Sequence, residues 1–325
     1  MPCTLPSSSD LESESIAYKV MRTVWVPWQR ERRLMREEER IQATRRSACL
    51  DAGFDHAAVL RHDGGVACWG YNEDGQAPPD GVEGDFVAVA AGSFHSLALR
   101  RNGSVACWGR NDEGQAPPDG VEGDFVAVAA GGAHSLALRR NGSVACWGHN
   151  DDGEAPPDGV EGDFVAISTG DRHSIALRRN GNVACWGYNG FDQAPPDGVE
   201  GDFVAIATGV RHSLALRRNG NVACWGSNDA GRAPPDGVEG DFVAIAAGGL
   251  HSLALRRDGN VACWGYNNYG QAPPDGVEGD FVAISAGGFH SIALRRNGSV
   301  ACWGLNHEGQ APPAGLDGPF KTAEV

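Results

Sequence analysis

The chain has 325 residues, with 42 acidic and 27 basic side chains, so its formal net charge is −15. No apolar run approaches the roughly 18 residues that a membrane-spanning helix needs, which argues against a membrane protein. A strongly acidic chain is also a poor direct ligand for nucleic-acid phosphates or anionic lipid, and it favours basic protein partners.

The first 46 residues differ from the rest of the chain. They hold 9 basic and 7 acidic residues, which leaves −17 on the remainder. Residues 1–15 are polar, and residues 29–46 combine mixed charge with strong helix formers. We therefore expect an N-terminal arm over residues 1–46, partly disordered with a charged, solvated helix. A partner-binding segment and a basic import signal around Arg30 are the alternatives. No secretory signal is recognisable, so we expect a cytoplasmic or nuclear location.

From residue 47 onward, a unit of 39 residues recurs seven times. Its clearest marker is Cys-Trp-Gly, with the tryptophans at Trp69, Trp108, Trp147, Trp186, Trp225, Trp264 and Trp303. A second marker, Gly-x-x-His, places histidines at His56, His95, His134, His173, His212, His251 and His290. Fixed periods of this length are typical of propellers and solenoids.

One unit predicts three clear strands and a weaker fourth. Residues 86–91, 95–101 and 105–109 have the β-branched, aromatic and alternating patterns of strands, and Asn102-Gly103 is a preferred two-residue hairpin turn. Residues 115–118 are the candidate outer strand, where proline is tolerated at an edge. Both faces of each strand are small or apolar, which suits blades stacked face to face. We therefore predict an all-β, seven-bladed β-propeller of four-stranded blades over residues 47–325. Residues 47–51 and 320–325 compete for one strand position in the closing blade, and we expect 320–325 to join blade one.

The residues that repeat in every unit predict structural roles and no catalytic site. We expect the tryptophans to form the core, the seven repeat cysteines to be small buried side chains without disulfides, and the histidines to bond loop backbone. No nucleophile with a dedicated base, no phosphate loop and no metal-ligand spacing stands out from the repeat. We therefore expect no enzyme activity, no cofactor and no metal.

The order Gly-x-x-His-Ser-Leu-Ala-Leu-Arg-x-x-Gly-x-Val-x-Cys-Trp-Gly-x-Asn-x-x-Gly-Gln resembles the repeat of the regulator of chromosome condensation family, over about residues 47–325. The resemblance implies a seven-bladed propeller. The founding member is a nucleotide exchange factor for a small nuclear GTPase and inserts a wedge from one blade, whereas every unit here is 39 residues long. A bacterial propeller that inhibits β-lactamases is also similar, and its compact repeats match this length. The tryptophan of the similar plant ultraviolet-B photoreceptor is replaced here at every matching position, for example by Phe94.

Two places vary between units: the pair before the histidine and the four residues after Trp-Gly. In an up-down-up sheet both places emerge on one face, which we call the variable face, and the Asn-Gly turns emerge on the other. Units six, seven and one carry mainly aromatic residues there, including Phe54; units two and three carry acids such as Asp112, Glu113 and Glu154; units four and five carry arginines, including Arg232. Aromatic and arginine anchors are typical of binding hot spots. The candidate protein-binding residues are Tyr71, Phe94, Arg110, Arg172, Tyr188, Phe191, Arg211, Leu250, Tyr266, Tyr269, Phe289 and Leu305.

The sequence thus favours a non-catalytic, monomeric propeller that binds a protein partner through its variable face. Two alternatives stay open. One is a guanine nucleotide exchange factor for a small GTPase, and the other is a proteinaceous enzyme inhibitor.

Overall fold

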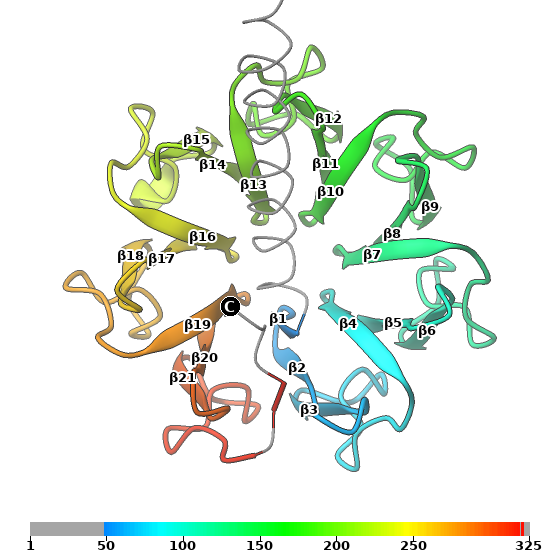
Figure 1. Ribbon diagram of the computed structural model, residues 1–325, viewed down its shortest axis with the longest axis horizontal. Coiled ribbons are helices and arrows are strands. Elements are labelled where there is room, and N and C mark those ends of the chain that lie inside the picture. The colour runs from blue at the N-terminus through cyan, green and yellow to red at the C-terminus, as the bar shows by residue number, and fades with distance from the viewer. Residues whose placement is uncertain (1–48, 319, 322–325) are drawn as a thin grey trace, which may run out of the picture. The chain divides into compact units, whose positions relative to one another are not determined.

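The computed structural model describes residues 49–318, 320 and 321. These residues form seven antiparallel sheets arranged as blades in a ring (Figure 1). The expected N-terminal arm, residues 1–46, and residues 322–325 lie outside the described residues. Within the described part of the chain, no helix is long and apolar enough to cross a membrane.

Each blade contains three strands in sequence order, with the first strand nearest the centre of the ring (Figure 1). From blade 1 to blade 7 the strands are β1 (Leu50–Ala52), β2 (His56–Leu60), β3 (Val66–Gly70); β4 (Phe86–Ala91), β5 (His95–Arg100), β6 (Val105–Gly109); β7 (Phe125–Ala130), β8 (His134–Arg139), β9 (Val144–Gly148); β10 (Phe164–Thr169), β11 (His173–Arg178), β12 (Val183–Gly187); β13 (Phe203–Thr208), β14 (His212–Arg217), β15 (Val222–Gly226); β16 (Phe242–Ala247), β17 (His251–Arg256), β18 (Val261–Gly265); and β19 (Phe281–Ala286), β20 (His290–Arg295), β21 (Val300–Gly304).

The predicted fourth strand is reduced to a single β-bridge in each blade. In blade 2, Val105 and Val121 exchange two backbone hydrogen bonds of 2.9 Å, and the equivalent pair recurs in the other blades. The prediction of an outer strand over residues 115–118 was wrong, because this segment is bent. Pro117 and Pro118 have no N–H to donate to a ladder, and the N–H of Ala116 is taken by the side chain of Asn111 at 2.9 Å.

The hairpin turn between the second and third strands is also longer than predicted. In blade 2 the backbone of Arg100 donates to Ser104 over 2.8 Å, which leaves three residues in the loop. Gly103 alone takes a positive φ, 93°, so the connection is a tight turn followed by a glycine bulge and not a two-residue turn.

The core consists of the faces where adjacent blades meet. Leu97 and Leu99 of β5 are buried, and they pack against Phe125 and Ala137 of blade 3, with Trp147 at the edge of the contact. The tryptophans are only half-buried, because they lie on the third strand near the outside of the ring. The expectation that they form the core is confirmed only in part: each tryptophan packs against a core cluster, but the fully buried side chains of the core are mainly aliphatic residues of the other strands.

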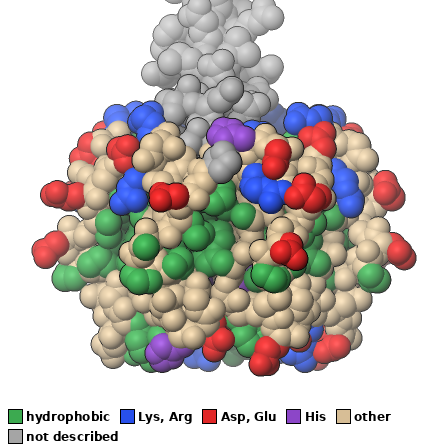
Figure 2. All heavy atoms as spheres, turned by 90° about the horizontal axis from the view of Figure 1, so that it is seen from below, with side chains coloured by type: hydrophobic (Ala, Val, Ile, Leu, Met, Phe, Trp, Pro, Cys, Tyr) green, Lys and Arg blue, Asp and Glu red, His purple; other side chains and the backbone are tan. Residues whose placement is uncertain are grey.

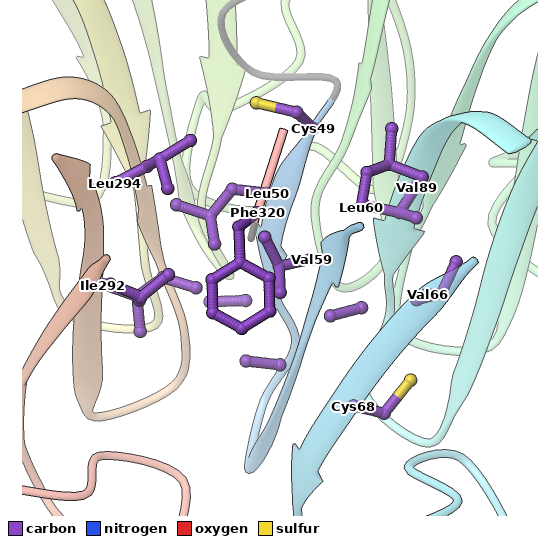
Figure 3. Packing of buried hydrophobic residues seen from close by; sticks show 14 of the residues in the cluster. Cys49, Leu50, Val59, Leu60, Val66, Cys68, Val89, Ile292, Leu294 and Phe320 are labelled. Atoms are coloured by element: carbon purple, nitrogen blue, oxygen red, sulfur yellow. The ribbon is translucent and has the colours of Figure 1, made fainter. Parts of the chain in front are cut away.

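The ring closes through a composite first strand in blade 1. Phe320 forms a bridge with Arg61, and Lys321 donates its N–H to Leu60 over 2.9 Å, while β1 continues the same strand position toward the centre. Phe320 is buried among Leu50, Val59 and Ile292 (Figure 3). In the other blades this strand has a register shift after its phenylalanine, as between Phe86 and Ala88. The break between the two ends of the chain falls at that bulge, so both ends share the position that we expected them to compete for.

Charged side chains gather at the two rims of the ring, and hydrophobic side chains form a band between them (Figure 2). At the rim of the Asn-Gly turns, Arg101 pairs with Asp85 at 3.0 Å, and Arg140, Arg218 and Arg257 pair in the same way with the acid 16 residues earlier. In blades 2 to 7 the neighbouring arginine of the turn lies over the first-strand phenylalanine, as Arg100 does over Phe86. Exposed pairs of this kind contribute little to stability.

Candidate functional site

The two variable segments of each unit lie side by side on one face of the ring. The backbone N–H that follows Trp-Gly donates to the carbonyl that precedes the histidine, from Arg110 to Phe94 over 2.9 Å and from Tyr266 to Leu250 over 3.0 Å. The same bond joins Tyr71 to Asp55, Tyr188 to Arg172, and Leu305 to Phe289. The predicted variable face therefore exists as one surface, and it is opposite to the arginine-rich turns.

Repeated polar residues brace each variable loop from within. In blade 1 the side chain of Asn72 accepts from the N–H of Ala77 at 2.8 Å, and the side chain of Gln76 accepts from the N–H of Asp74 at 3.1 Å. The carbonyl of Gln76 then accepts from Ser96 Oγ and from Trp108 Nε1 in blade 2. The loops are held by the repeat, so the side chains that vary are presented on a fixed backbone.

The histidines hold adjacent blades together. His56 Nε2 lies 2.8 Å from Ser96 Oγ of the next blade. The single hydrogen of that hydroxyl goes to Gln76, so the histidine is the donor. The predicted partner, loop backbone, was therefore wrong, although the role is structural. Burial lowers the pKa of His134 and His173 to about 3, so the rings are neutral.

The chain of histidine contacts is incomplete between blades 7 and 1. Blade 1 has Ala57 where the other blades have serine, and His290 Nε2 is buried without a hydrogen-bond partner among the described residues. The rest of the arrangement is present there, because Trp69 Nε1 donates to the carbonyl of Gln310 at 3.0 Å.

Nine of the twelve candidate residues gather into three groups, of which the first spans blades 6, 7 and 1. We call it the aromatic cluster: Phe54, Tyr266, Tyr269 and Phe289. The ring of Phe289 lies edge-on to the other three, with centroids at 5.6 Å from Tyr269, 5.9 Å from Phe54 and 6.3 Å from Tyr266. Tyr269 is 47% exposed, which is unusual for a large ring that already contacts two others. Such a cluster offers a ready apolar surface to a partner.

The second and third groups combine arginine with aromatic rings. In blades 4 and 5, Arg172 lies over Tyr188 at 5.6 Å and Arg211 lies over Phe191 at 4.7 Å. In blade 2, Arg110 lies over Phe94 at 5.6 Å and also pairs with Asp112 at 2.8 Å. These arginines are already engaged with rings of the chain itself.

Carboxylates lie in the variable loops of blades 7 and 1, which also carry Phe289 and Phe54 of the aromatic cluster. Asp55 follows Phe54, is half-buried, and accepts a hydrogen bond from Gln310 Nε2 at 3.1 Å. Burial raises its pKa, and the exposed Glu308 of blade 7 raises it further. Glu73 and Asp74 lie in the next loop, where Tyr71 donates to Glu73 at 2.9 Å. The sequence reasoning missed Asp55, although blade 1 alone has an acid immediately before the histidine.

Two residues that the sequence assigned to the exposed face are buried. Glu154 and Arg232 stand where other units have glutamine, and each is 1% exposed. Glu154 contacts His149 Nδ1 at 2.5 Å, and Arg232 donates to the carbonyl of Ser227 at 3.1 Å. The position points inward because its side chain braces the loop, so variation there is not variation of the surface.

The centre of the same face is hollow but small. The Gly-x-x-His loops of the seven blades line a cavity of about 80 Å³, mostly with glycine and alanine. Within the described ranges, no three His, Cys, Asp or Glu side chains are placed to hold a metal ion. The arrangement on this face is therefore suited to contacts with another surface.

Comparison with known proteins gives one family. The model of the family described as "Regulator of chromosome condensation (RCC1) repeat" matches seven segments of the chain: residues 48–76, 86–115, 125–154, 164–193, 203–232, 242–271 and 281–310. No curated protein matched the chain.

Solved propellers share the fold. The CRINKLY WD40 ectodomain of the Arabidopsis thaliana receptor kinase ACR4 aligns with a TM-score of 0.64 and 23% identity, over 82% of this chain and 98% of that one. The ectodomain of the Physcomitrella patens receptor kinase CR4 aligns with a TM-score of 0.64 and 26% identity, over 79% of this chain and 73% of that one. Prp20p from Saccharomyces cerevisiae, described with its binding properties to Gsp1p and histones, aligns with a TM-score of 0.62 and 21% identity, over 80% of this chain and 83% of that one.

Proposed function

The chain belongs to the regulator of chromosome condensation repeat family, and from that premise we propose that it is a non-catalytic propeller that binds a protein partner through its variable face. One observation carries the proposal. The aromatic cluster joins three blades on a face whose backbone the repeat holds fixed. Rigid aromatic side chains on a braced scaffold lose little entropy on binding, which is how interface anchors work.

The test removes the cluster and leaves the repeat intact. A variant with Tyr266→Ala, Tyr269→Ala and Phe289→Ala should lose the partners that the wild-type chain captures, as read by affinity purification and mass spectrometry. None of the three rings belongs to the buried core between the blades, so the melting temperature should change by only a few degrees. The matched control changes Arg101, Arg140 and Arg257 to alanine, three exposed side chains at the opposite rim, and it should keep the captured partners. An unchanged set of captured proteins in the triple variant would refute the proposal.

Nucleotide exchange on a small GTPase is the second candidate, because the founding member of the family is an exchange factor of that kind. The uniform 39-residue unit argues against it, because no blade has an insertion that could enter a partner. Release of a labelled guanine nucleotide from candidate GTPases separates the two functions. Acceleration at substoichiometric amounts of this chain would favour exchange over simple binding.

A further inference from the structure

The aromatic rings of the variable face have different neighbours in different blades. In blades 2 and 4, the rings of Phe94, Tyr188 and Phe191 each lie beneath a guanidinium of the chain, at centroid distances of 5.6, 5.6 and 4.7 Å. Guanidinium groups stack on aromatic faces because the ring quadrupole attracts the cation. Arginine on a ring is thus the recurring arrangement of this face.

The aromatic cluster has no such cation. The variable loops of blades 6, 7 and 1 contain no lysine and no arginine. They contain instead the four carboxylates Asp55, Glu73, Asp74 and Glu308. This sector therefore combines several rings with an excess of negative charge, and no other sector of the face does so.

Asp55 is the carboxylate best placed to act with the rings. It adjoins Phe54, whose ring contacts that of Phe289 and whose carbonyl accepts the backbone N–H of Gly288 at 2.9 Å, so it lies at the boundary of blades 7 and 1. It is half-buried, its one side-chain hydrogen bond comes from the neutral amide of Gln310, and it forms no ion pair among the described residues. A partly desolvated carboxylate gains most from a cation that arrives with its own hydrogen-bond donors.

We propose that the aromatic cluster, together with Asp55 and Glu308, binds an arginine side chain presented by a basic segment of the partner protein. The rings would stack on the planar face of the guanidinium, and the carboxylates would accept hydrogen bonds from its N–H groups. This arrangement suits the planar arginine head group, with its five N–H donors, better than the compact ammonium of lysine. The inference rests on the proposed function and adds the chemistry that the face selects.

The direct test uses a fluorescein-labelled Gly-Arg-Gly-Arg-Gly-Arg-Gly peptide and measures its anisotropy with the full chain. The peptide should bind, and its citrulline counterpart, which has the same shape without the charge, should bind at least tenfold more weakly. The lysine counterpart should lie between the two. Equal binding of the citrulline peptide, or no binding of the arginine peptide at millimolar protein, would overturn the proposal.

Variants locate the site. The double change Asp55→Asn and Glu308→Gln should weaken the arginine peptide at least tenfold, and Tyr269→Leu should do the same without altering any charge. The matched control is Asp112→Asn with Glu113→Gln, which removes two charges from the same face in blade 2 and should leave binding within twofold. An equal loss in the control would show attraction to the acidic chain in general and would overturn the proposal.

The outcomes separate this inference from the proposed function. If the triple alanine variant loses its captured partner and the arginine peptide does not bind, the face binds protein by other chemistry and only this inference fails. If the arginine comes from a second copy of the chain, the chain will sediment as a dimer that Arg211→Gln dissociates. That result would overturn the assignment to a separate partner.

Discussion

Replacing Ala57 with serine should stabilise the protein. At six of the seven boundaries between blades, a serine hydroxyl is placed to join a histidine to the carbonyl of the loop before it, as Ser96 joins His56 to Gln76. At the boundary of blades 7 and 1 the hydroxyl is absent, and His290 Nε2 is buried without a partner among the described residues. A hydroxyl at residue 57 would accept a hydrogen bond from His290 Nε2 and donate one to the carbonyl of Gln310.

The size of the effect follows from the hydrogen bonds gained. A hydrogen bond between neutral groups contributes about 0.5–1.5 kcal/mol net, and relief of a buried unsatisfied donor adds to that, so we expect a gain of about 1–2 kcal/mol. For a domain of this size each kcal/mol raises the Tm by roughly 2–4 °C. Thermal and urea unfolding of the Ala57→Ser variant beside the wild type measures the change.

The reciprocal variant is the control. Ser135→Ala removes the hydroxyl that His95 Nε2 contacts at 2.8 Å and should cost about 1–3 kcal/mol, because the buried donor then loses its acceptor. A Tm for Ala57→Ser that is unchanged or lower than that of the wild type would refute the account of the boundary. It would mean that His290 is satisfied in some other way or that the serine is strained.

Three further predictions concern stability. Burial lowers the pKa of His173 and His251 to about 3; because this is below the unfolded value of about 6.5, the unfolded chain binds more protons as the pH falls from 6.5 toward 3, and urea midpoints should fall over that window. Burial raises the pKa of Asp51 to about 6, above its unfolded value of about 3.9, so the unfolded chain loses this proton first and stability falls as the pH rises from about 3.9 to about 6. Asp51→Asn should therefore stabilise the protein by about 1–3 kcal/mol at pH 7 but hardly at pH 4, as read by urea unfolding; an equal gain at both pH values would contradict this. Phe320→Ala should cost about 3–5 kcal/mol by emptying the closing contact, as read by urea unfolding, while Lys321→Ala, which keeps its backbone bond, should cost less than about 0.5 kcal/mol.

The ring and its seven blades could be predicted because packing repeats with the period. Each blade must offer the same aliphatic face to the next, so Leu99 and Phe125 recur every 39 residues, and their recurrence determines the architecture. The tryptophans recur for a different reason. The indole N–H of Trp108 donates a hydrogen bond to the carbonyl of Gln76. A tryptophan retained for this hydrogen bond cannot be told from the sequence apart from a tryptophan retained for burial.

Other details depend on which way a side chain turns, and the pattern does not contain that information. Arg232 and Glu154 vary between units, which suggested exposure, yet both turn inward because their position braces the loop. Arg110, Arg172 and Arg211 were predicted to bind a partner, and the structure shows that each already lies over a ring of its own chain. That pairing links segments close in space but distant in the repeat, so only the folded blades show it.

The aromatic cluster and the closing boundary of the ring occupy the same place. Phe54 of blade 1 and Phe289 of blade 7 are in contact at 5.9 Å, across the boundary where His290 lacks its serine and where the first strand is built from both ends of the chain. A partner that binds both rings must therefore span the boundary, and its binding energy also opposes opening of the ring there, since a ligand stabilises the state that it binds. The missing hydroxyl weakens the same boundary that a bound partner would reinforce. This coupling gives a physical reason for the cluster to lie across blades 7 and 1 rather than within a single blade.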